Sequence, residues 1–253
     1  MASFSMSNSY FRFKKFTITQ DRCAMKVTTD GCLFGAWCAL SIHQLVVGKN
    51  YLPANHKVLD IGAGTGLLSL MYAQQNPKAS IDAVEIDEAA ATQASENVAR
   101  SPWPAGIQII HQNINDFRPR WHYDVILSNP PFYEQQLKSV DDKKNAAHHS
   151  SHLLQDELFS SANRLLTPNG YFFVLQPFYR TAEAIAMAER FLLFPVKKIW
   201  VRQTPQHEYF RTILLFRRQK ISAPGEEELV IEIEKGKYSD EFTTLLKEYY
   251  LYM

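Results

Sequence analysis

The stretch KVLDIGAGTGLLSL, residues 57–70, decides the fold of this chain. Its first residues are mostly apolar and predict a buried strand, three glycines follow at every second position, and a helix is expected from Leu67 onward. A strand, a glycine-rich turn and a helix open the doubly wound α/β folds, in which a ligand lies on the turn at the helix N-terminus. The sequence therefore predicts a mainly parallel sheet with a ligand site at Gly62, Gly64 and Gly66.

The spacing of these glycines bears on the kind of ligand. Nicotinamide and flavin enzymes tend to carry G-x-G-x-x-G after the strand. This chain instead has G-x-G-x-G with Asp60 before the first glycine. That spacing resembles the motif of S-adenosylmethionine-dependent methyltransferases. A dinucleotide site and a generic strand–helix turn are the alternatives.

Two further motifs fall where neighbouring strands are expected to end. SIDAVEID (80–87) predicts a second buried strand ending at Glu85, about twenty residues past the turn, where doubly wound folds place a carboxylate for ribose hydroxyls. A solvated helix cap is the alternative. A later strand, 123–127, runs into Asn129-Pro130-Pro131-Phe132. Two prolines cannot continue a central strand, and they leave the Pro130 carbonyl without a sequential donor. Strand termination alone requires neither the asparagine before them nor the aromatic residue after them.

The remaining pattern alternates between strands and helices. Beyond the motifs above, it predicts a strand or hairpin from Tyr10, helices at 30–47, 67–75, 88–100, 153–166, 181–193 and 240–250, strands at 107–111, 171–176, 197–202, 211–217 and 229–233, and a polar loop at 133–150. Thr29 or Asp30, then Asp87 and Ser239, are the expected N-caps. The strands at 197–202 and 211–217 should form an antiparallel hairpin that closes the sheet.

Length and composition indicate an ordinary globular protein. The 253 residues, 46% apolar and 21% charged, suit one domain with small additions. The net charge of +1 gives no overall basic field, although a local basic patch is enough to bind RNA. Candidate RNA contacts are Arg12, Lys14, Lys15, Lys143, Lys144, Lys197, Lys198, Arg202 and Arg211.

Membrane, export and metal signals are weak. No apolar run approaches the ~20 residues of a membrane span, and the N-terminus lacks a signal-peptide pattern. The three cysteines are an odd number without paired C-x-x-C spacing, so we expect reduced thiols, a cytoplasmic protein and no metal site.

The glycine turn, Glu85 and the Asn129–Phe132 box together resemble class I methyltransferases that modify an amino nitrogen. Over nearly its whole length the chain is similar to a narrower family, the tRNA adenine methyltransferases that act on the adenine 3′ of the anticodon in a valine tRNA. The blocks FRFKKFTITQDRCAMKVTTDG (11–31), LFGAW (33–37) and YYLY (249–252) carry this similarity.

The resemblance implies a Rossmann-like, doubly wound sheet of seven mainly parallel strands with an antiparallel last strand. It implies an N-terminal extension over residues 1–55 that covers the cofactor site and a methyltransferase core over 56–220. A C-terminal strand and helix over 221–253 complete the same domain. The implied partner is tRNA, with no membrane, metal or obligatory protein partner.

The resemblance also assigns roles to residues. Asn129 and Pro130 are the implied catalytic pair. Phe132, placed with them in the catalytic group, can stack on the extruded base, with Tyr133 as the alternative, and Pro131 belongs to the same substrate site. The implied S-adenosylmethionine ligands are Lys26, Thr28, Asp60, Gly62, Gly64, Gly66, Glu85, Asn113, Ile114 and Asn129. The family usually has an aspartate where Asn113 stands. An amide oxygen accepts hydrogen bonds more weakly than a carboxylate, and Asp116 is the alternative ligand.

The chemistry explains these residue types. Hydrogen bonds from an exocyclic amine to the Asn129 side-chain oxygen and the Pro130 carbonyl favour a pyramidal nitrogen and stabilise the charge that grows on it. No strong base is needed early, so the lack of a clear catalytic histidine is expected. Other substrates with the same chemistry are a protein glutamine amide and DNA or rRNA adenine. A nucleotide-binding oxidoreductase and a non-catalytic binding domain are disfavoured by the glycine spacing and the intact box.

Overall fold

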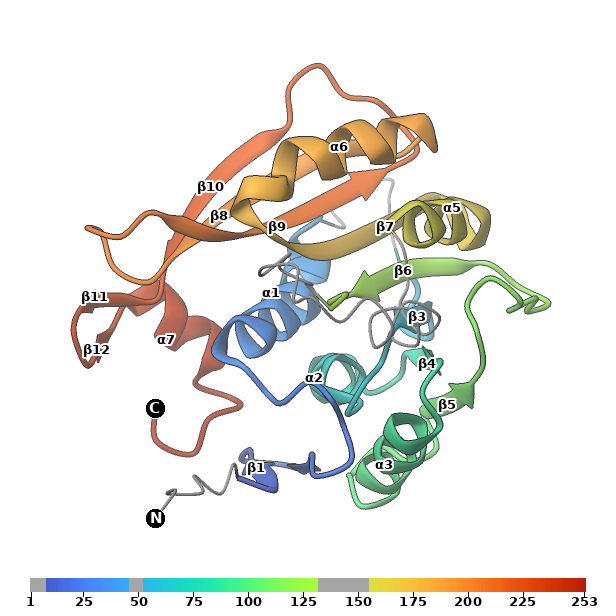
Figure 1. Cartoon of the computed structure of the whole chain (residues 1–253), viewed down its shortest axis with the longest axis horizontal. Coiled ribbons are helices and arrows are strands. Elements are labelled where there is room, and N and C mark those ends of the chain that lie inside the picture. Colours follow the sequence, from blue (N-terminus) through green and yellow to red (C-terminus); the bar gives the residue numbers. More distant parts are fainter. Residues whose placement is uncertain (1–7, 46–51, 132–154) are drawn as a thin grey trace, which may run out of the picture.

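The structure is a computed structural model, and it describes residues 8–45, 52–131 and 155–253. An eight-stranded sheet forms its centre, in the order β10-β8-β9-β7-β6-β3-β4-β5 (Figure 1). The strands are β3 (Lys57–Ile61), β4 (Ser80–Glu85), β5 (Ile107–His111), β6 (Tyr123–Ser128), β7 (Leu166–Pro177), β8 (Phe194–Arg202), β9 (Tyr209–Arg217) and β10 (Gly225–Val230).

Within this sheet β9 alone runs antiparallel to its neighbours β7 and β8, and every other adjacent pair is parallel. The predicted seven-stranded arrangement is therefore present in the strands that lie between β5 and β8 in this spatial order, both included. The antiparallel strand, β9, is the last of these seven along the chain. Strand β10 adds an eighth strand at the edge. The predicted Rossmann-like class and the hairpin of β8 and β9 are confirmed.

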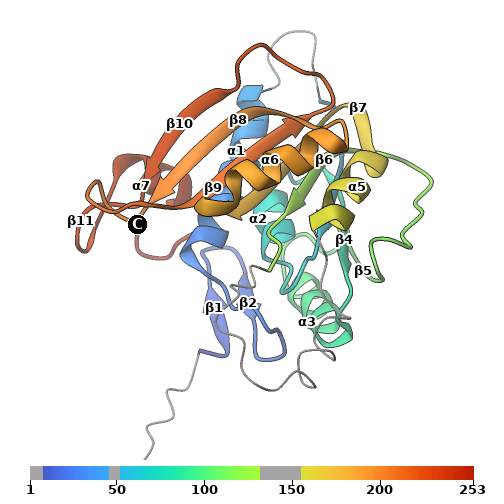
Figure 2. The ribbon, with the colours of Figure 1, turned by 45° about the horizontal axis from the view of Figure 1, so that its top comes forward.

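Helices cover both faces of the sheet (Figures 1 and 2). They are α1 (Thr29–Leu45), α2 (Leu67–Gln75), α3 (Glu88–Ala99) and α7 (Asp240–Leu246) on one side, and α5 (Gln155–Leu165) and α6 (Thr181–Arg190) on the other. Successive side chains of a strand point to opposite faces, so β7 contributes Phe173 and Leu175 to the core under α1 and α2. It contributes Phe172 and Val174 to the core under α5 and α6.

The N-terminal residues form a separate hairpin of β1 (Tyr10–Arg12) and β2 (Thr17–Thr19), which lies beside α3 (Figure 2). The C-terminal end of the chain meets it, because the Lys14 N–H donates to the carbonyl of Tyr249 at 2.8 Å. A second small hairpin, β11 (Glu232–Glu234) and β12 (Lys237–Tyr238), precedes α7, and a 3₁₀ turn (Phe178–Arg180) joins β7 to α6. Throughout the described ranges, every helix is too short or too polar to cross a bilayer.

The structure corrects some expected boundaries. Helix α1 begins at Thr29, and its N-cap is Thr28, whose Oγ1 accepts from the Gly31 N–H at 3.2 Å. The caps Asp87 and Ser239 are confirmed, since each accepts from the N–H three residues later. Strand β7 starts at Leu166 and runs through the expected turn at 168–170. The expected strand 229–233 is divided between β10 and β11, and the expected loop 133–150 lies outside the described residues.

Candidate active site

Three strands bring the predicted site residues to one edge of the sheet. Strand β3 lies between β4 and β6, and all three are parallel, so their carboxyl ends meet. Strand β3 leads into Gly62, β4 ends at Glu85, and β6 leads into Asn129. The Ser128 hydroxyl donates to the carbonyl of Ile61 at 2.9 Å and ties the ends of β6 and β3 together.

The glycine turn needs glycine for its backbone. Gly62, Gly64 and Gly66 have φ of 75°, 54° and 80°, in the left-handed region that side chains disfavour. A Cβ on Gly62 or Gly64 would meet nothing within 4 Å, whereas one on Gly66 would lie 3.5 Å from the Cβ of Ala94 in α3. Gly62 and Gly64 therefore border open space that a ligand can approach, and Gly66 allows close packing of the turn against α3.

Glu85 holds this turn in place. The residue is 8% exposed; Oε2 accepts from the Gly64 N–H at 2.7 Å, and Oε1 accepts from the Asp87 N–H at 2.9 Å. A carboxylate oxygen has two acceptor positions, so each oxygen keeps one for a further donor. The residue thus fits a role as acceptor for ribose hydroxyls while it also shapes the turn.

Asp60 lies beneath the turn and is fully buried. Its Oδ2 accepts from the Ser69 N–H at 3.1 Å and from the Ser69 hydroxyl at 2.7 Å, which fixes the start of α2. Its Oδ1 is buried and has no partner among the described residues. Burial raises the pKa of Asp60 from 3.8 to about 6; the two Ser69 bonds oppose this shift, and the charge of Glu85 adds to it.

Asn129 carries an unsatisfied acceptor. Its Oδ1 is buried and has no hydrogen-bond partner in the described parts of the chain. Its Nδ2 lies 3.5 Å from the position that a Cβ on Gly31 would occupy, in the first turn of α1. Pro130 is buried and Pro131 half-buried, while the predicted substrate residues Phe132 and Tyr133 lie outside the described residues. Because buried polar atoms are normally paired, Oδ1 of Asn129 fits a donor supplied by a ligand.

The N-terminal segment reaches the same edge. A Cβ on Gly31 would lie 3.1 Å from Oγ1 of Thr28 and 3.7 Å from Cδ2 of Leu67, so α1 approaches Asn129 and the glycine turn closely. Lys26 donates from Nζ to the carbonyl of Gln20, within the segment that leads to α1. Thr28 therefore joins the site through α1, and Lys26 stabilises the chain just before it.

The loop after β5 holds the remaining predicted cofactor residues. Asn113 Oδ1 accepts from the Asn115 N–H at 2.8 Å and shapes a turn, and Ile114 is buried. Arg164 of α5 donates to the carbonyls of Ile114 and Phe117 at 2.9 and 2.8 Å, which anchors the loop. The amide oxygen of Asn113 already serves the turn, so a ligand would share it.

Sequence reasoning missed Gly31 and the ion pair that holds it. Nε of Arg211 in β9 lies 2.7 Å from Oδ2 of Asp30, whose Oδ1 accepts from the Gly31 N–H at 3.1 Å. The available signal was a glycine in the first turn of an apolar helix, where glycine costs about 1 kcal/mol relative to alanine.

Comparisons with known proteins identify the class. A family model described as "Methyltransferase small domain" matches residues 44–194. An Agrobacterium tumefaciens structure titled a predicted O-methyltransferase shares the fold with a TM-score of 0.61 and 16% identity, over 86% of this chain and 95% of that one. A Listeria monocytogenes protein assigned to the class I S-adenosylmethionine-dependent methyltransferases has a TM-score of 0.57 at 18% identity, over 83% and 66%. The family model shows that the chain is a methyltransferase, and its fold is that of the class I S-adenosylmethionine-dependent methyltransferases, as the sequence predicted.

Curated relatives narrow this class. A Flavobacterium johnsoniae protein is 40% identical over 96% of this chain and 100% of its own, and a Parabacteroides distasonis protein 37% over 98% and 100%. A Dyadobacter fermentans protein is 42% identical over 96% of this chain and 98% of its own length. All three are named tRNA1(Val) (adenine(37)-N6)-methyltransferase. The chain belongs to the family of these proteins, and the resemblance predicted from its sequence is confirmed.

Proposed function

We propose that this protein transfers the methyl group of S-adenosylmethionine to N6 of adenine 37 in a valine tRNA. The observation that carries the proposal is the buried, unpaired Oδ1 of Asn129 at the edge formed by the glycine turn and Glu85. End-to-end similarity to relatives named for this reaction supports the substrate. A tRNA substrate implies that the protein works in the cytoplasm.

The residues at the edge fit the cofactor. S-adenosylmethionine, when bound, supplies an electrophilic methyl group on a positively charged sulfur. Glu85 accepts from the ribose hydroxyls, and the backbone of Gly62 and Gly64 borders the open space beside it. Asn113 and Ile114 flank the adenine of the cofactor, with Asp116 as the alternative acceptor for its amino group. Asp60, Gly66, Thr28 and Lys26 hold the turn and the segment around them.

Catalysis in this proposal rests on two oxygens. Oδ1 of Asn129 and the carbonyl of Pro130 accept the two hydrogens of the target amine and turn its lone pair away from the ring. Because Oδ1 is buried, it is preorganised in a site of low dielectric, where it stabilises the charge that grows on nitrogen. Pro131, Phe132 and Tyr133 hold the extruded base, with Phe132 stacked on it.

The proposal includes a division of the chain. Residues 1–55 are an extension that covers the cofactor site, 56–220 are the catalytic core, and 221–253 complete the same domain. The close approach of Gly31 to Asn129 supports the covering role. A glutamine amide or a DNA or rRNA adenine is the alternative substrate for the same chemistry.

The test is transfer of a labelled methyl group to defined acceptors. Valine tRNA transcripts with adenine or guanine at position 37, a DNA duplex, and a protein extract are each incubated with enzyme and labelled cofactor. We expect label only in the adenine-37 transcript, and N6-methyladenosine in its nuclease digest by mass spectrometry. Equal label in the guanine-37 transcript overturns the assigned position, and label in DNA or protein alone overturns the substrate.

A further inference from the structure

The hairpin of β1 and β2 carries a hollow of about 340 Å³ lined by Arg12, Lys14, Lys15, Thr17, Thr19 and Arg100, which we call the basic hollow. The rings of Phe13 and Phe16 stack 4.5 Å apart in the core, and both are buried. The two residues between them, Lys14 and Lys15, are therefore left at the exposed tip of the hairpin. Arg100 comes from the end of α3, more than eighty residues further along the chain.

The basic hollow has an excess of positive charge. In the part of the chain that the structure describes, Arg12 and Lys15 have no carboxylate partner, and no acidic residue lines the hollow. Nζ of Lys14 donates to the backbone carbonyl of Lys247. A carbonyl carries no formal charge, so this bond does not neutralise Lys14. Arg100 lies 3.6 Å from Glu96, but Glu96 also pairs with Arg22. Of the four cations of the hollow, only Arg100 therefore has a carboxylate partner among the described residues, and it shares that carboxylate with Arg22.

Other candidate RNA contacts are neutralised within the protein. Lys197, Lys198 and Arg202 of β8 pair with Glu227, Glu226 and Glu228 of the adjacent strand β10. Arg211 pairs with Asp30. Lys143 and Lys144 lie outside the described residues. Of the candidate cations that the structure describes, the hairpin residues are the ones whose charge remains available to a polyanion.

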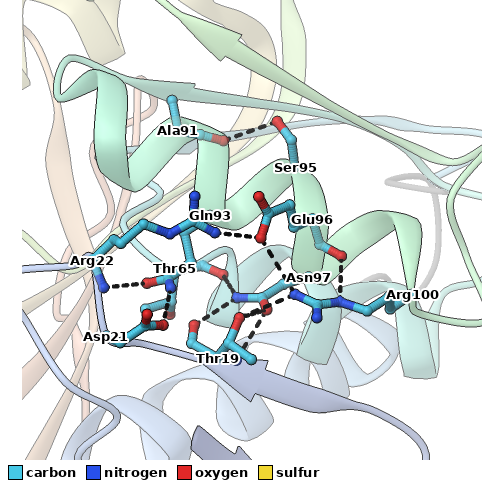
Figure 3. A network of polar contacts seen from close by, with 10 residues as sticks. All are labelled: Thr19, Asp21, Arg22, Thr65, Ala91, Gln93, Ser95, Glu96, Asn97 and Arg100. Carbon is cyan, nitrogen blue, oxygen red and sulfur yellow. Dashed lines mark hydrogen bonds and ion pairs between the residues drawn. The ribbon is translucent and has the colours of Figure 1, made fainter. Parts of the chain in front are cut away.

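Asn97 links Thr19, which lines the basic hollow, to Thr65 of the glycine turn (Figure 3). The side chain of Asn97 in α3 accepts from the Thr19 N–H at 2.9 Å and from its hydroxyl at 2.6 Å, and donates to its carbonyl at 2.9 Å. The same amide donates to the carbonyl of Thr65 at 3.0 Å, between Gly64 and Gly66. The side chain of Asn97 therefore holds both Thr19, which lines the basic hollow, and Thr65 of the glycine turn. An anion bound in the hollow is thus held at a fixed position relative to the sheet edge that carries Asn129.

Guanidinium, ammonium and hydroxyl donors without a facing carboxylate suit a phosphodiester group. Contacts to phosphate oxygens set the register of a nucleic acid without reading its bases. We propose that the basic hollow binds a backbone phosphate of the RNA substrate and positions the RNA so that its target adenine reaches Asn129. This inference rests on the proposed function, since it assumes that the substrate is RNA.

The test compares two double variants with equal loss of charge. Arg12→Gln with Lys15→Gln removes two cations of the hollow, both exposed and without an ion pair in the described ranges. Lys78→Gln with Lys235→Gln, at exposed positions elsewhere, is the matched control. Binding of valine tRNA is measured by fluorescence anisotropy between about 50 and 200 mM salt. Binding of S-adenosylhomocysteine is measured by calorimetry.

We expect the hollow variant to lose roughly ten- to a hundredfold in tRNA affinity at about 0.1 M salt, and the slope of log affinity against log salt to fall by about 2. The control variant should keep affinity and slope near the parent values, and both should bind S-adenosylhomocysteine as the parent does. If the parent methylates tRNA but the hollow variant binds it like the control, the inference is wrong and the proposed function stands. If the parent transfers no methyl group to tRNA, both fall.

Discussion

The side-chain amide of Asn129 packs against Gly31, with Nδ2 only 3.5 Å from the position of a Cβ on that glycine. Asn129 follows β6 and Gly31 lies in the first turn of α1, so the contact joins the proposed catalytic group to the N-terminal segment. The ion pair of Arg211 with Asp30 holds the neighbouring residue from the side of β9. The position of Asn129 therefore depends on three distant parts of the chain.

A residue larger than alanine at Gly31 should displace Asn129. In Gly31→Ala the new Cβ lies 3.1 Å from Oγ1 of Thr28, a strain that offsets the gain of up to about 1 kcal/mol in helix propensity. In Gly31→Val the γ-carbons add volume beside Asn129. We expect turnover of the valine variant to fall by about 10²-fold, as misplacement by ~1 Å does, with little change for alanine. Single-turnover kinetics with saturating tRNA measure this, and equal rates for all three proteins would contradict it.

Asn129→Ala should separate activity from stability. Oδ1 of Asn129 has no partner among the described residues, so its removal breaks no hydrogen bond of that oxygen and leaves no acceptor unpaired. We expect thermal stability equal to or above that of the parent, affinity for S-adenosylhomocysteine retained, and turnover reduced by about 10²-fold or more. Calorimetry and methyl transfer to valine tRNA test the two halves independently. A variant that turns over at the parent rate refutes the assigned role.

Local signals were sufficient for most of the fold. The glycine turn, the buried strands and the caps Asp87 and Ser239 depend on neighbours within a few residues, and the sequence predicted them. The cap of α1 is different, because Thr28, Thr29 and Asp30 are all good capping residues. Thr28 becomes the cap because Gly31 packs against Asn129 and Arg211 binds Asp30. Both are contacts with distant parts of the chain, so the sequence around Thr28 does not reveal them.

The ranking of the basic residues also needed the structure. Lys198 and Arg202 looked equal to Arg12 and Lys15 as RNA contacts. Their pairing with glutamates follows from the parallel register of β8 and β10, which sets Glu226 opposite Lys198. Arg100 joins the basic hollow only because α3 packs along the hairpin. The sequence predicted the strand ends that precede Gly62 and Asn129 and that carry Glu85, but it does not tell which charges remain unpaired.

Glu85→Gln should not behave as a conservative change. Both carboxylate oxygens of Glu85 accept from backbone N–H groups, of Gly64 and Asp87. The NH₂ group of a glutamine would therefore face one of these donors. We expect affinity for S-adenosylhomocysteine to fall by about ten- to a hundredfold, the effect of losing a hydrogen bond to a charged group. Glu88→Gln, which removes a nearby exposed carboxylate, is the control and should bind as the parent does. Calorimetry that gives the same affinity for both variants rules out the role of Glu85.

Asp60 makes stability depend on pH in an unusual direction. Its pKa is raised from 3.8 to about 6 by burial, so the folded state binds the proton more tightly than the unfolded state does. This contribution favours folding below about pH 4 and is lost as the pH rises through about 6. Above pH 6 the buried carboxylate opposes folding by about 3 kcal/mol, because a tenfold difference in proton affinity between the two states corresponds to about 1.4 kcal/mol.

Asp60→Asn should remove this dependence while keeping the acceptor for the N–H and hydroxyl of Ser69. The free energy of unfolding is measured by urea at pH 5 and pH 8 for the variant and the parent. The variant should exceed the parent by more at pH 8 than at pH 5. The advantage should differ by about 1 kcal/mol between the two pH values, because at pH 5 the folded parent already holds most of its proton. Ser69→Ala, which removes the hydroxyl bond but keeps the carboxyl, should retain the parent's pH dependence. If parent and Asp60→Asn respond to pH alike, Asp60 is ionised at both values and its burial does not raise its pKa.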